Sequence, residues 1–574
     1  MHKKHISLVS FLLALVLFVT AGCNGKKPEQ NTSSATADTQ NPSSSDSTAS
    51  EPENIDVPPD DAWEVIGSDD GYETPDDSLD MSMLEVSLTN QNASAPIQSD
   101  FLGFNAVYHA FTFRDDSNYG RSHTARSAKA ELDAAQKSGI NIARTVFDAN
   151  SAWNMTTQSW DWESSDMKAL YRWCLELKER GIDVWISYFY AFKELYPQYI
   201  SYEGGTTHYA QGTKPSYFYV EGDQQKTFDR FSGFIDELVR QLFSHGCTNA
   251  KYLGLSTEPG FVFYEYENKT PEQLAQRYAE EFMGYSNAVH RKLTESKLRQ
   301  NITIIGPNEG ASTTPNGYMM KACYNMDREG AIDLYSCHSY NRDSKLEDDS
   351  GIFWHEDFGK KLDGFGGGPD KLIIDEGGYT NEGSYDRIRI NNPFFGTNIA
   401  MWQVTQLNYG IRSSFIWTLF DQQWPNNDAT NNDSFENGVQ YCGLLPNFIV
   451  SSVPRPAYYA FSTIANYLGV EGSKIYACDY GADEGVGVYM SMSELPDGNI
   501  SVVVVNACIE KVKVHVNFEK AIGKTLYRHL YNPSDITPDE TTHVIPAGAK
   551  ISKPGTGFTD ILPAYGITVY TTVS

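Results

Sequence analysis

Residues 250–260 read AKYLGLSTEPG, a short apolar run that leads directly into a glutamate. Its first eight residues have the length and apolar content of a strand covered on both faces. Seven similar runs occur in the same part of the chain, and together the candidate strands are 101–109, 140–147, 183–189, 250–257, 302–307, 332–338, 371–376 and 412–419. Helical stretches separate them, and this alternation is typical of a parallel α/β sheet or barrel.

The helical stretches carry boundary signals. Thr270-Pro271-Glu272-Gln273 combines an N-cap residue, a proline at the first helical position and a capping-box glutamine. Helices are expected at 124–138, 164–180, 226–244, 271–296, 316–326, 352–362 and 395–409. Eight β/α units predict a TIM barrel over 81–455. A doubly wound open sheet is the alternative, but no glycine-rich phosphate loop follows the first candidate strand.

Pro454-Arg455-Pro456 introduces a last helix, expected at Ala457–Leu468, and beyond it the hydrophobic period changes to two. Six strands are expected at 474–480, 486–493, 500–507, 511–518, 524–531 and 563–573. Residues 456–574 are therefore predicted to form an antiparallel β-sandwich accessory domain. The stretch 82–90 is also strand-like, and a crossover could add it to that sandwich.

The N-terminus predicts the compartment. A basic start, an apolar run over 6–19 and small residues before Cys23 form a secretory signal over 1–23. The pattern resembles the lipobox of bacterial lipoproteins, which implies lipidation of Cys23 and anchoring outside the cytoplasm, with plain secretion as the alternative. Residues 24–80, rich in Ser, Thr and Asp, predict a disordered tether.

The amino-acid composition limits the classes of substrate, metal and partner that the protein is expected to bind. The net charge of −29 argues against nucleic acid and polyanionic substrates. Eight scattered cysteines without a paired metal-ligand spacing predict no zinc, and most of them are expected to be buried fillers. No metal or organic cofactor is expected, and the protein is expected to be a monomer. The acidic loop 426–437 could bind calcium, but it lacks the EF-hand spacing.

Two glutamates stand where barrel enzymes place catalytic groups, at the C-terminal ends of strands. Glu258 follows the fourth candidate strand and Glu376 ends the seventh. Glycoside hydrolysis needs two carboxylates, and in a retaining enzyme one protonates the leaving oxygen while the other attacks the anomeric carbon. Both could instead be salt-bridge partners at the barrel rim.

This layout resembles clan A of the glycoside hydrolases, which includes families 5, 30 and 39. The resemblance implies that Glu258 is the acid/base and Glu376 the nucleophile of a retaining hydrolase acting on β-linked poly- or oligosaccharides. It also implies that substrate-binding residues end the other strands, namely His109, Arg144, His338, Tyr340 and Trp417. The clan usually has Asn before the acid/base, where this chain has Thr257, so the identity of the 2-substituent of the sugar stays open.

Two alternatives remain at the level of sequence. The dipeptide Asn308-Glu309 follows the fifth strand; Glu309 is a rival acid/base and Asn308 a candidate substrate contact, although counting strands favours Glu258. The chain could also be an inactive carbohydrate-binding lipoprotein or a transglycosylase. Neither the sugar and its linkage nor endo or exo action follows from the sequence.

Overall fold

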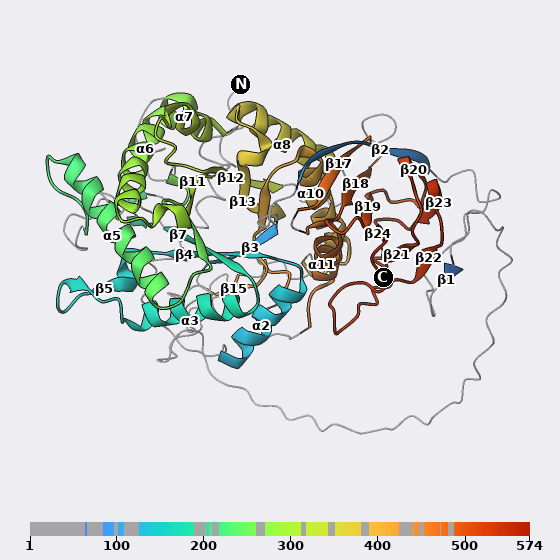
Figure 1. Ribbon diagram of the computed structural model, residues 1–574, viewed down its shortest axis with the longest axis horizontal. Helices are drawn as coiled ribbons and strands as arrows, with labels where there is room; N and C mark the ends of the chain where they lie inside the picture. The colour runs from blue at the N-terminus through green and yellow to red at the C-terminus, as the bar shows by residue number, and fades with distance from the viewer. Residues whose placement is uncertain are drawn as a thin grey trace, which may run out of the picture.

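The computed structural model describes residues 64–65, 84–96, 102–107, 125–188, 201–203, 206–208, 217–259, 270–310, 317–341, 350–379, 390–423, 439–440, 442–446, 453–470, 472–479 and 487–574. Eight parallel strands close into a barrel, because the eighth strand pairs with the first (Figure 1). They are β3 (Leu102–Val107), β4 (Ile142–Phe147), β7 (Asp183–Tyr188), β10 (Ala250–Gly254), β11 (Thr303–Glu309), β12 (Leu334–Asn341), β13 (Leu372–Tyr379) and β14 (Ser413–Ile416). The predicted barrel is confirmed, and the open-sheet alternative is wrong.

Helices surround the barrel, and their boundaries lie close to those predicted. They are α2 (Ala125–Lys137), α3 (Ser165–Glu179), α5 (Gln224–Ser244), α6 (Pro271–Glu295), α7 (Tyr318–Met326), α8 (Ser350–Phe365) and α10 (Phe394–Tyr409). The capping box at the start of α6 is confirmed, since the Thr270 side chain accepts from the Gln273 N–H and the Gln273 side chain accepts from the Thr270 N–H. Shorter elements are η3 (Ala149–Ala152), η5 (Arg299–Asn301), η7 (Pro369–Lys371) and the hairpin strands β5 (Trp153–Asn154), β6 (Ser159–Trp160), β8 (Ser201–Glu203), β9 (Thr206–His208), β15 (Gln422–Gln423) and β16 (Val439–Gln440).

The interior of the barrel is a packed core with a polar layer above it. One apolar cluster takes a residue from each of seven strands: Ile142, Trp185, Tyr252, Ile305, Leu334, Ile373 and Phe415. Side chains two positions further along a strand face the same way. On β4 and β7 those residues are Arg144 and Ser187, both buried. The strands therefore supply an apolar floor and then polar groups toward their C-terminal ends.

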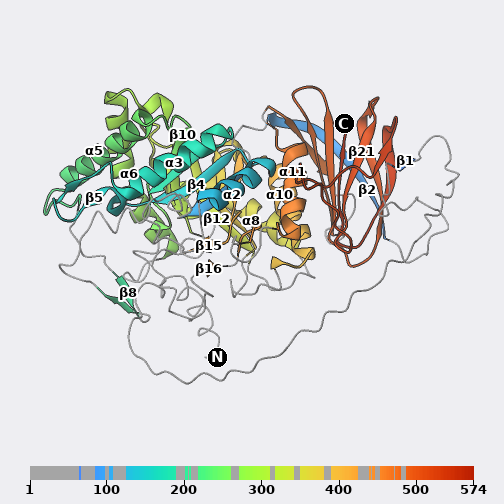
Figure 2. The same ribbon diagram turned by 90° about the horizontal axis from the view of Figure 1, so that it is seen from below.

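The second domain is a ten-stranded sheet in which most neighbours are antiparallel. In spatial order the strands are β1 (Glu64–Val65), β22 (Ala549–Ile551), β21 (Leu526–Tyr531), β24 (Ile567–Thr571), β19 (Ile500–Asn506), β18 (Val488–Glu494), β17 (Lys474–Asp479), β2 (Leu84–Pro96), β20 (Val512–Ile522) and β23 (Gly555–Leu562). Strand β2 pairs parallel to β20, so the strand-like stretch 82–90 belongs to this sheet rather than to the barrel (Figure 2). The six predicted strands are all present, the strand-like stretch 82–90 overlaps β2, and the structure adds β1, β22 and β23.

The two halves of this sheet face each other across a hydrophobic core. Phe558 on β23 and Tyr570 on β24 lie far apart in strand order, yet their ring centroids are 4.5 Å apart. Arg528 on β21 and Asp560 on β23 form an ion pair of 2.7 Å in which neither side chain is exposed. The hydrogen-bonded sheet therefore curls back on itself around these contacts.

Helices α10 and α11 (Pro456–Leu468) lie between the barrel and the curled sheet (Figure 1). Most of α10 is buried, as expected for a helix that is covered on several sides. A Cβ added at Gly396 would lie 2.5 Å from the hydroxyl oxygen of Tyr531, so this contact needs glycine. The hydroxyl of Tyr458 on α11 donates to Ala134 O on α2 at 2.7 Å. The two domains thus share a continuous packed boundary.

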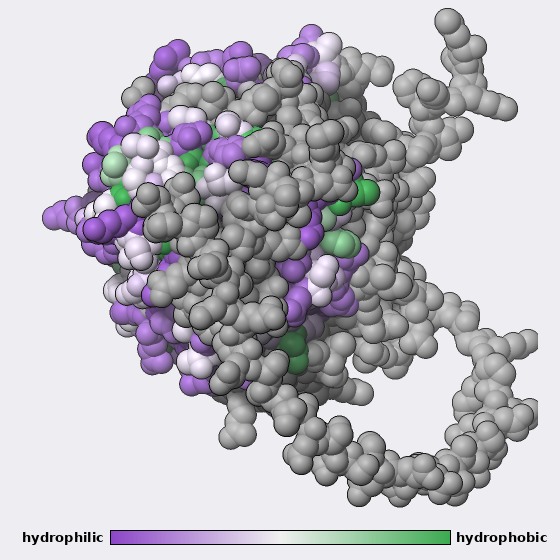
Figure 3. All heavy atoms as spheres, turned by 90° about the vertical axis from the view of Figure 1, so that its right-hand side faces the viewer, coloured by the Kyte–Doolittle hydropathy of each residue, from purple (hydrophilic) through white to green (hydrophobic). Residues whose placement is uncertain are grey.

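The described surface is mainly polar. On the face drawn in Figure 3, hydrophobic residues form small patches between hydrophilic ones. The large apolar side chains with the greatest exposure among the described residues are Ile509 and Val453. No helix within the described ranges has both the length and the apolar character that a membrane span requires. The seven cysteines in the described part of the chain are all free and five are buried, which confirms their expected role as fillers.

Candidate active site

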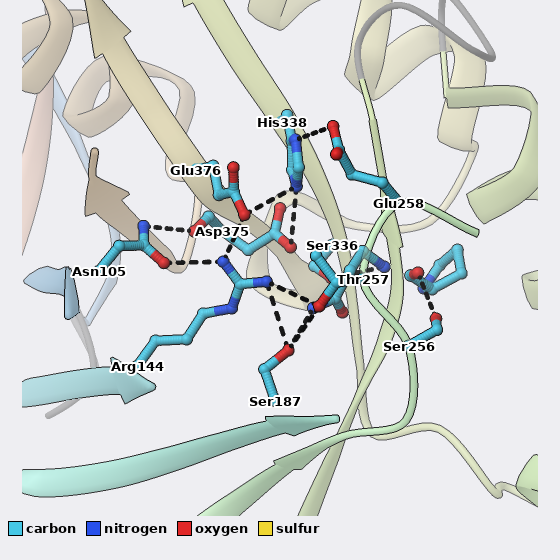
Figure 4. Close-up of polar contacts among 12 residues, drawn as sticks. Asn105, Arg144, Ser187, Ser256, Thr257, Glu258, Ser336, His338, Asp375 and Glu376 are labelled. Atoms are coloured by element: carbon cyan, nitrogen blue, oxygen red, sulfur yellow. Dashed lines mark hydrogen bonds and ion pairs between the residues drawn. The ribbon is translucent and has the colours of Figure 1, made fainter. Parts of the chain in front are cut away.

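The carboxyl group of Glu376, near the C-terminal end of β13, accepts hydrogen bonds from two side chains. Nη1 of Arg144 lies 2.6 Å from its Oε1 (Figure 4). The hydroxyl of Tyr340 donates to its Oε2 at 2.8 Å. Burial raises the pKa of Glu376, but the charges of His338 and Arg144 and the hydrogen bonds from Arg144 and Tyr340 outweigh it and lower the pKa overall. The carboxyl group is therefore held ionised.

Glu258 follows β10 in a left-handed backbone conformation, with φ of 45°. Its N–H donates to Asn308 O at 3.0 Å, and the preceding Ser256 hydroxyl donates to Pro307 O, which ties the turn to β11. A Cβ added at Gly310 would lie 2.8 Å from Oε1 of Glu258, so the glycine leaves space for this side chain. This backbone conformation therefore directs the Glu258 carboxyl group toward the C-terminal end of the barrel.

His338 lies between the two glutamates (Figure 4). Its Nδ1 is 3.2 Å from Oε1 of Glu258, and its Nε2 is 3.4 Å from Oε1 of Glu376. Burial would lower the pKa of His338, but Glu376, Asp375 and Glu258 raise it to about 9. At neutral pH the ring is therefore a cation flanked by carboxyl groups on both sides, and the two glutamates are one imidazole ring apart.

Asp375 also faces the interior. Strand alternation alone would point Asp375 away from Glu376, but the register of β13 shifts between Ile374 and Glu376. A bulge of this kind breaks the alternation of side chains. Oδ2 of Asp375 lies 3.8 Å from Nε2 of His338, and burial raises the pKa of Asp375 to about 6 against the lowering effect of His338 and Arg144.

Arg144 is the centre of a buried polar network. Besides Glu376, its guanidinium donates to Asn105 Oδ1 at 2.7 Å and to the hydroxyls of Ser187 and Thr257 at 3.3 and 3.4 Å. The guanidinium also lies over the ring of Trp185, 5.0 Å from its centroid. Asn105 in turn donates to Asp375 O. These contacts fix the orientation of Arg144 toward Glu376.

Thr257 and Asn308 lie beneath the carboxylates and are almost fully buried. The Thr257 hydroxyl contacts Ser187 at 3.1 Å as well as Arg144. The amide of Asn308 donates to Ser187 and accepts from Ser336. Both side chains therefore have protein partners at the positions where the sequence suggested contacts to substrate.

Glu309 points away from the two catalytic candidates. Its carboxylate accepts from the backbone N–H groups of Met319 and Met320 at 3.2 and 3.0 Å, at the start of α7. Carboxylates at a helix N-terminus satisfy unpaired donors and stabilise the helix dipole. The structure thus gives the rival acid/base a structural partner instead.

Of the remaining predicted residues, the structure describes only Trp417. Trp417 follows β14 and is partly exposed, and its backbone N–H donates to Gly377 O beside Glu376. His109, Cys23 and the loop 426–437 lie outside the described residues. Asn105 and Ser187 join the site without having been predicted, although Ser187 stands two residues after the inward Trp185. Among the described residues, no group of three or more His, Cys, Asp or Glu could hold a metal ion.

Comparison with known proteins gives the fold. No family model and no curated protein sequence matches the chain. Among solved structures, a conserved exported protein from Bacteroides fragilis matches with a TM-score of 0.54 and 11% identity, over 84% of this chain and 100% of that one. The GH51 arabinofuranosidase from Xanthomonas axonopodis pv. citri matches with a TM-score of 0.53 and 13% identity, over 85% of this chain and 100% of that one.

A third match is the GH30 endoxylanase from Clostridium papyrosolvens C71, with a TM-score of 0.51 and 13% identity, over 85% of this chain and 99% of that one. All three alignments span nearly the whole of the other protein, so they include both the barrel and the C-terminal sheet domain. The chain therefore has the two-domain fold of glycoside hydrolases in families 30 and 51, at low sequence identity.

Proposed function

We propose that the protein is a retaining glycoside hydrolase in which Glu376 is the nucleophile and Glu258 the general acid/base. The observation that carries the proposal is the pair of carboxyl groups that face each other across His338 at the C-terminal end of a closed barrel. This is the face on which barrel enzymes assemble their active sites. Two carboxylates of different environment are also what acid/base and nucleophilic roles require.

The surroundings of each glutamate support the division of roles. Glu376 is 9% exposed and is held by Arg144 and Tyr340, so it is ionised and fixed as a nucleophile must be. The side chain of Glu258 is 19% exposed and contacts only His338 among the ion pairs described. It can therefore exchange a proton with a leaving group and with water.

The proposed reaction is a double displacement. A Glu376 oxygen bonds to the anomeric carbon while the glycosidic bond breaks, and Glu258 gives its proton to the departing oxygen. Water then attacks the glycosyl-enzyme, loses a proton to Glu258 and releases Glu376, so that the configuration is retained. Arg144 and Tyr340 stabilise the negative charge on Glu376 at the start and end of the cycle.

The proposal assigns the other predicted residues in three groups. His338 and Tyr340 act directly on the carboxylates, and Trp417 and His109 are proposed to contact the sugar from the ends of the eighth and first strands. Thr257 and Asn308 are proposed to hold Arg144 and the Glu258 turn, because their polar atoms are already bonded within the protein. Recognition of the 2-position of the sugar then falls to other residues of the cleft.

The substrate is proposed to be a neutral or weakly charged β-linked poly- or oligosaccharide, which suits the net charge of −29. We also propose that the protein is exported and anchored through lipidated Cys23, that it acts as a monomer, and that the C-terminal sheet is a β-sandwich that braces the barrel. Metabolic labelling with a fatty-acid probe, comparing wild type with Cys23→Ala, tests the anchor.

The function is tested by sugar release from a panel of β-glycans, with xylan and aryl arabinofuranosides included, for wild type and Glu376→Gln. We expect release from at least one substrate and a loss of about 10³-fold or more in the variant, because no nucleophile remains. A wild type that binds a glycan without cleaving any member of the panel would instead favour a binding protein. An active Glu376→Gln variant would refute the assignment of the nucleophile.

A further inference from the structure

Asp375 is a buried carboxyl group that the proposed reaction does not consume. It has no exposed surface, and within the described residues neither of its carboxylate oxygens has a hydrogen-bond partner. Its nearest charged contact is Nε2 of His338, at 3.8 Å. A buried charge without hydrogen bonds is costly unless it compensates another charge. The position therefore calls for an electrostatic explanation.

The charges that face His338 come from four elements of the barrel. Glu258 follows β10, Tyr340 lies on β12, Asp375 and Glu376 lie on β13, and Arg144 reaches in from β4. The cations Arg144 and His338 thus lie beside the carboxylates of Glu376 and Asp375. The charge of Asp375 adds to that of Glu376 on the Nε2 side of the His338 ring.

We propose that Asp375 is a positioning residue whose fixed negative charge keeps His338 as an imidazolium between Glu258 and Glu376 throughout the double displacement. This inference rests on the proposed function for its role in the reaction, although the charge of His338 can be measured without substrate. The inference also explains the bulge in β13, because the register shift brings both Asp375 and Glu376 to the interior.

The balance of charge through the reaction supports this role. In the first step Glu376 forms the bond to the anomeric carbon and becomes a neutral ester. The electrons of the broken glycosidic bond go to the leaving oxygen, which takes the proton of Glu258, so Glu258 becomes the anion. One negative charge thus moves from the Nε2 side of His338 to its Nδ1 side. The second step with water reverses the transfer.

The negative charge of Asp375 favours the imidazolium form of His338, which can then donate toward either glutamate without losing its proton. Without that charge, the buried His338 cation would have one compensating carboxylate fewer and would release its proton at lower pH. Asp375→Asn should therefore lower the pKa of His338, which in the wild type is about 9.

The experiment is an NMR titration of the full chain with ¹³Cε1-labelled histidine, in which His338→Gln assigns the signal among the 12 histidines. We expect a midpoint near pH 9 in the wild type, a midpoint lower by at least one pH unit in Asp375→Asn, and recovery toward the wild-type value in Asp375→Glu. The matched control is Asp357→Asn, whose carboxylate contacts Ser339 and Lys361 rather than His338; its titration should match that of the wild type.

Two results would overturn the inference. One is a wild-type His338 midpoint at or below about 6.5, the ordinary pKa of histidine. This measurement uses the wild type alone, so it does not depend on whether a variant folds. The other is a folded Asp375→Asn variant whose midpoint is unchanged. A shifted titration in a protein without glycosidase activity would refute the proposed function while leaving the electrostatic role of Asp375 intact, so the two failures are distinguishable.

Discussion

The hydroxyl of Tyr340 donates a 2.8 Å hydrogen bond to Oε2 of Glu376, on the side of the carboxylate opposite Arg144. This bond is one of the interactions that lower the pKa of Glu376. Since the nucleophile must be ionised, activity is lost as the pH falls through this pKa. Hydrogen bonds to an ionised group favour that form, so removing one raises the pKa.

Tyr340→Phe should therefore move the acidic limb of the kcat/KM profile upward by about one pH unit, equivalent to about 1.4 kcal/mol. At a pH well above that limb the activity should also fall, because the hydroxyl orients the nucleophile. The pH profile of an aryl glycoside substrate measures both effects. An acidic limb that stays in place would show that Tyr340 does not act on Glu376.

Glu309 offers a matched comparison with Glu258, since both follow barrel strands and both were candidate acid/base residues. Glu309→Gln should keep near wild-type turnover and lower the free energy of unfolding by about 1 kcal/mol, because one of the two bonds to the start of α7 is lost. Glu258→Gln should instead lose about 10²–10⁴-fold on substrates with poor leaving groups. A large loss of turnover in Glu309→Gln would reverse these assignments.

Gly310 tests the placement of the Glu258 side chain. Alanine at this position would put a methyl group 2.8 Å from Oε1 of Glu258, so the carboxyl group must shift away from His338. We expect kcat to fall about 10-fold or more with little change in melting temperature, since positioning errors of this size reduce catalysis. The control is Gly233→Ala on α5, where no atom lies near the added Cβ, and we expect it to leave kcat unchanged.

The buried pair of Arg528 and Asp560 should stabilise the C-terminal sheet domain without affecting the chemistry. Asp560 also accepts from the hydroxyl of Tyr570 at 2.6 Å. Asp560→Asn leaves Arg528 without its counter-charge and should cost about 3–5 kcal/mol. Calorimetry should show a lower melting temperature than Asp497→Asn, a change in an exposed turn. Equal melting temperatures for the two variants would contradict the role of the pair.

The sequence predicted the barrel well because its strands are continuous apolar runs bounded by helix signals. The glutamates at the ends of the fourth and seventh strands could be found by counting, whereas Arg144, His338 and Tyr340 were implied by the resemblance to clan A. These residues gather around Glu376 as a consequence of the closed parallel barrel, in which successive strand ends meet at one face.

Other features depend on local geometry that residue patterns do not encode. Asp375 could not be assigned to the site because the bulge in β13 breaks strand alternation, and nothing in the sequence of 371–376 indicates a bulge. Strand β23 was missed because GTGFTDIL is rich in glycine and threonine. The burial of Asp560 on this strand is explained only by its ion pair with Arg528. Asn105 was overlooked because an uncharged amide in an apolar run does not stand out from the core.

The central claim is that Glu376 attacks the anomeric carbon and Glu258 assists departure of the leaving group. Its most direct test is azide rescue of Glu376→Gly and Glu258→Ala on an activated aryl β-glycoside, with the product configuration determined by proton NMR. The account predicts an α-glycosyl azide from Glu376→Gly, because azide replaces the missing nucleophile, and a β-glycosyl azide from Glu258→Ala, because azide intercepts the glycosyl-enzyme. The opposite pairing of variant and configuration would contradict it.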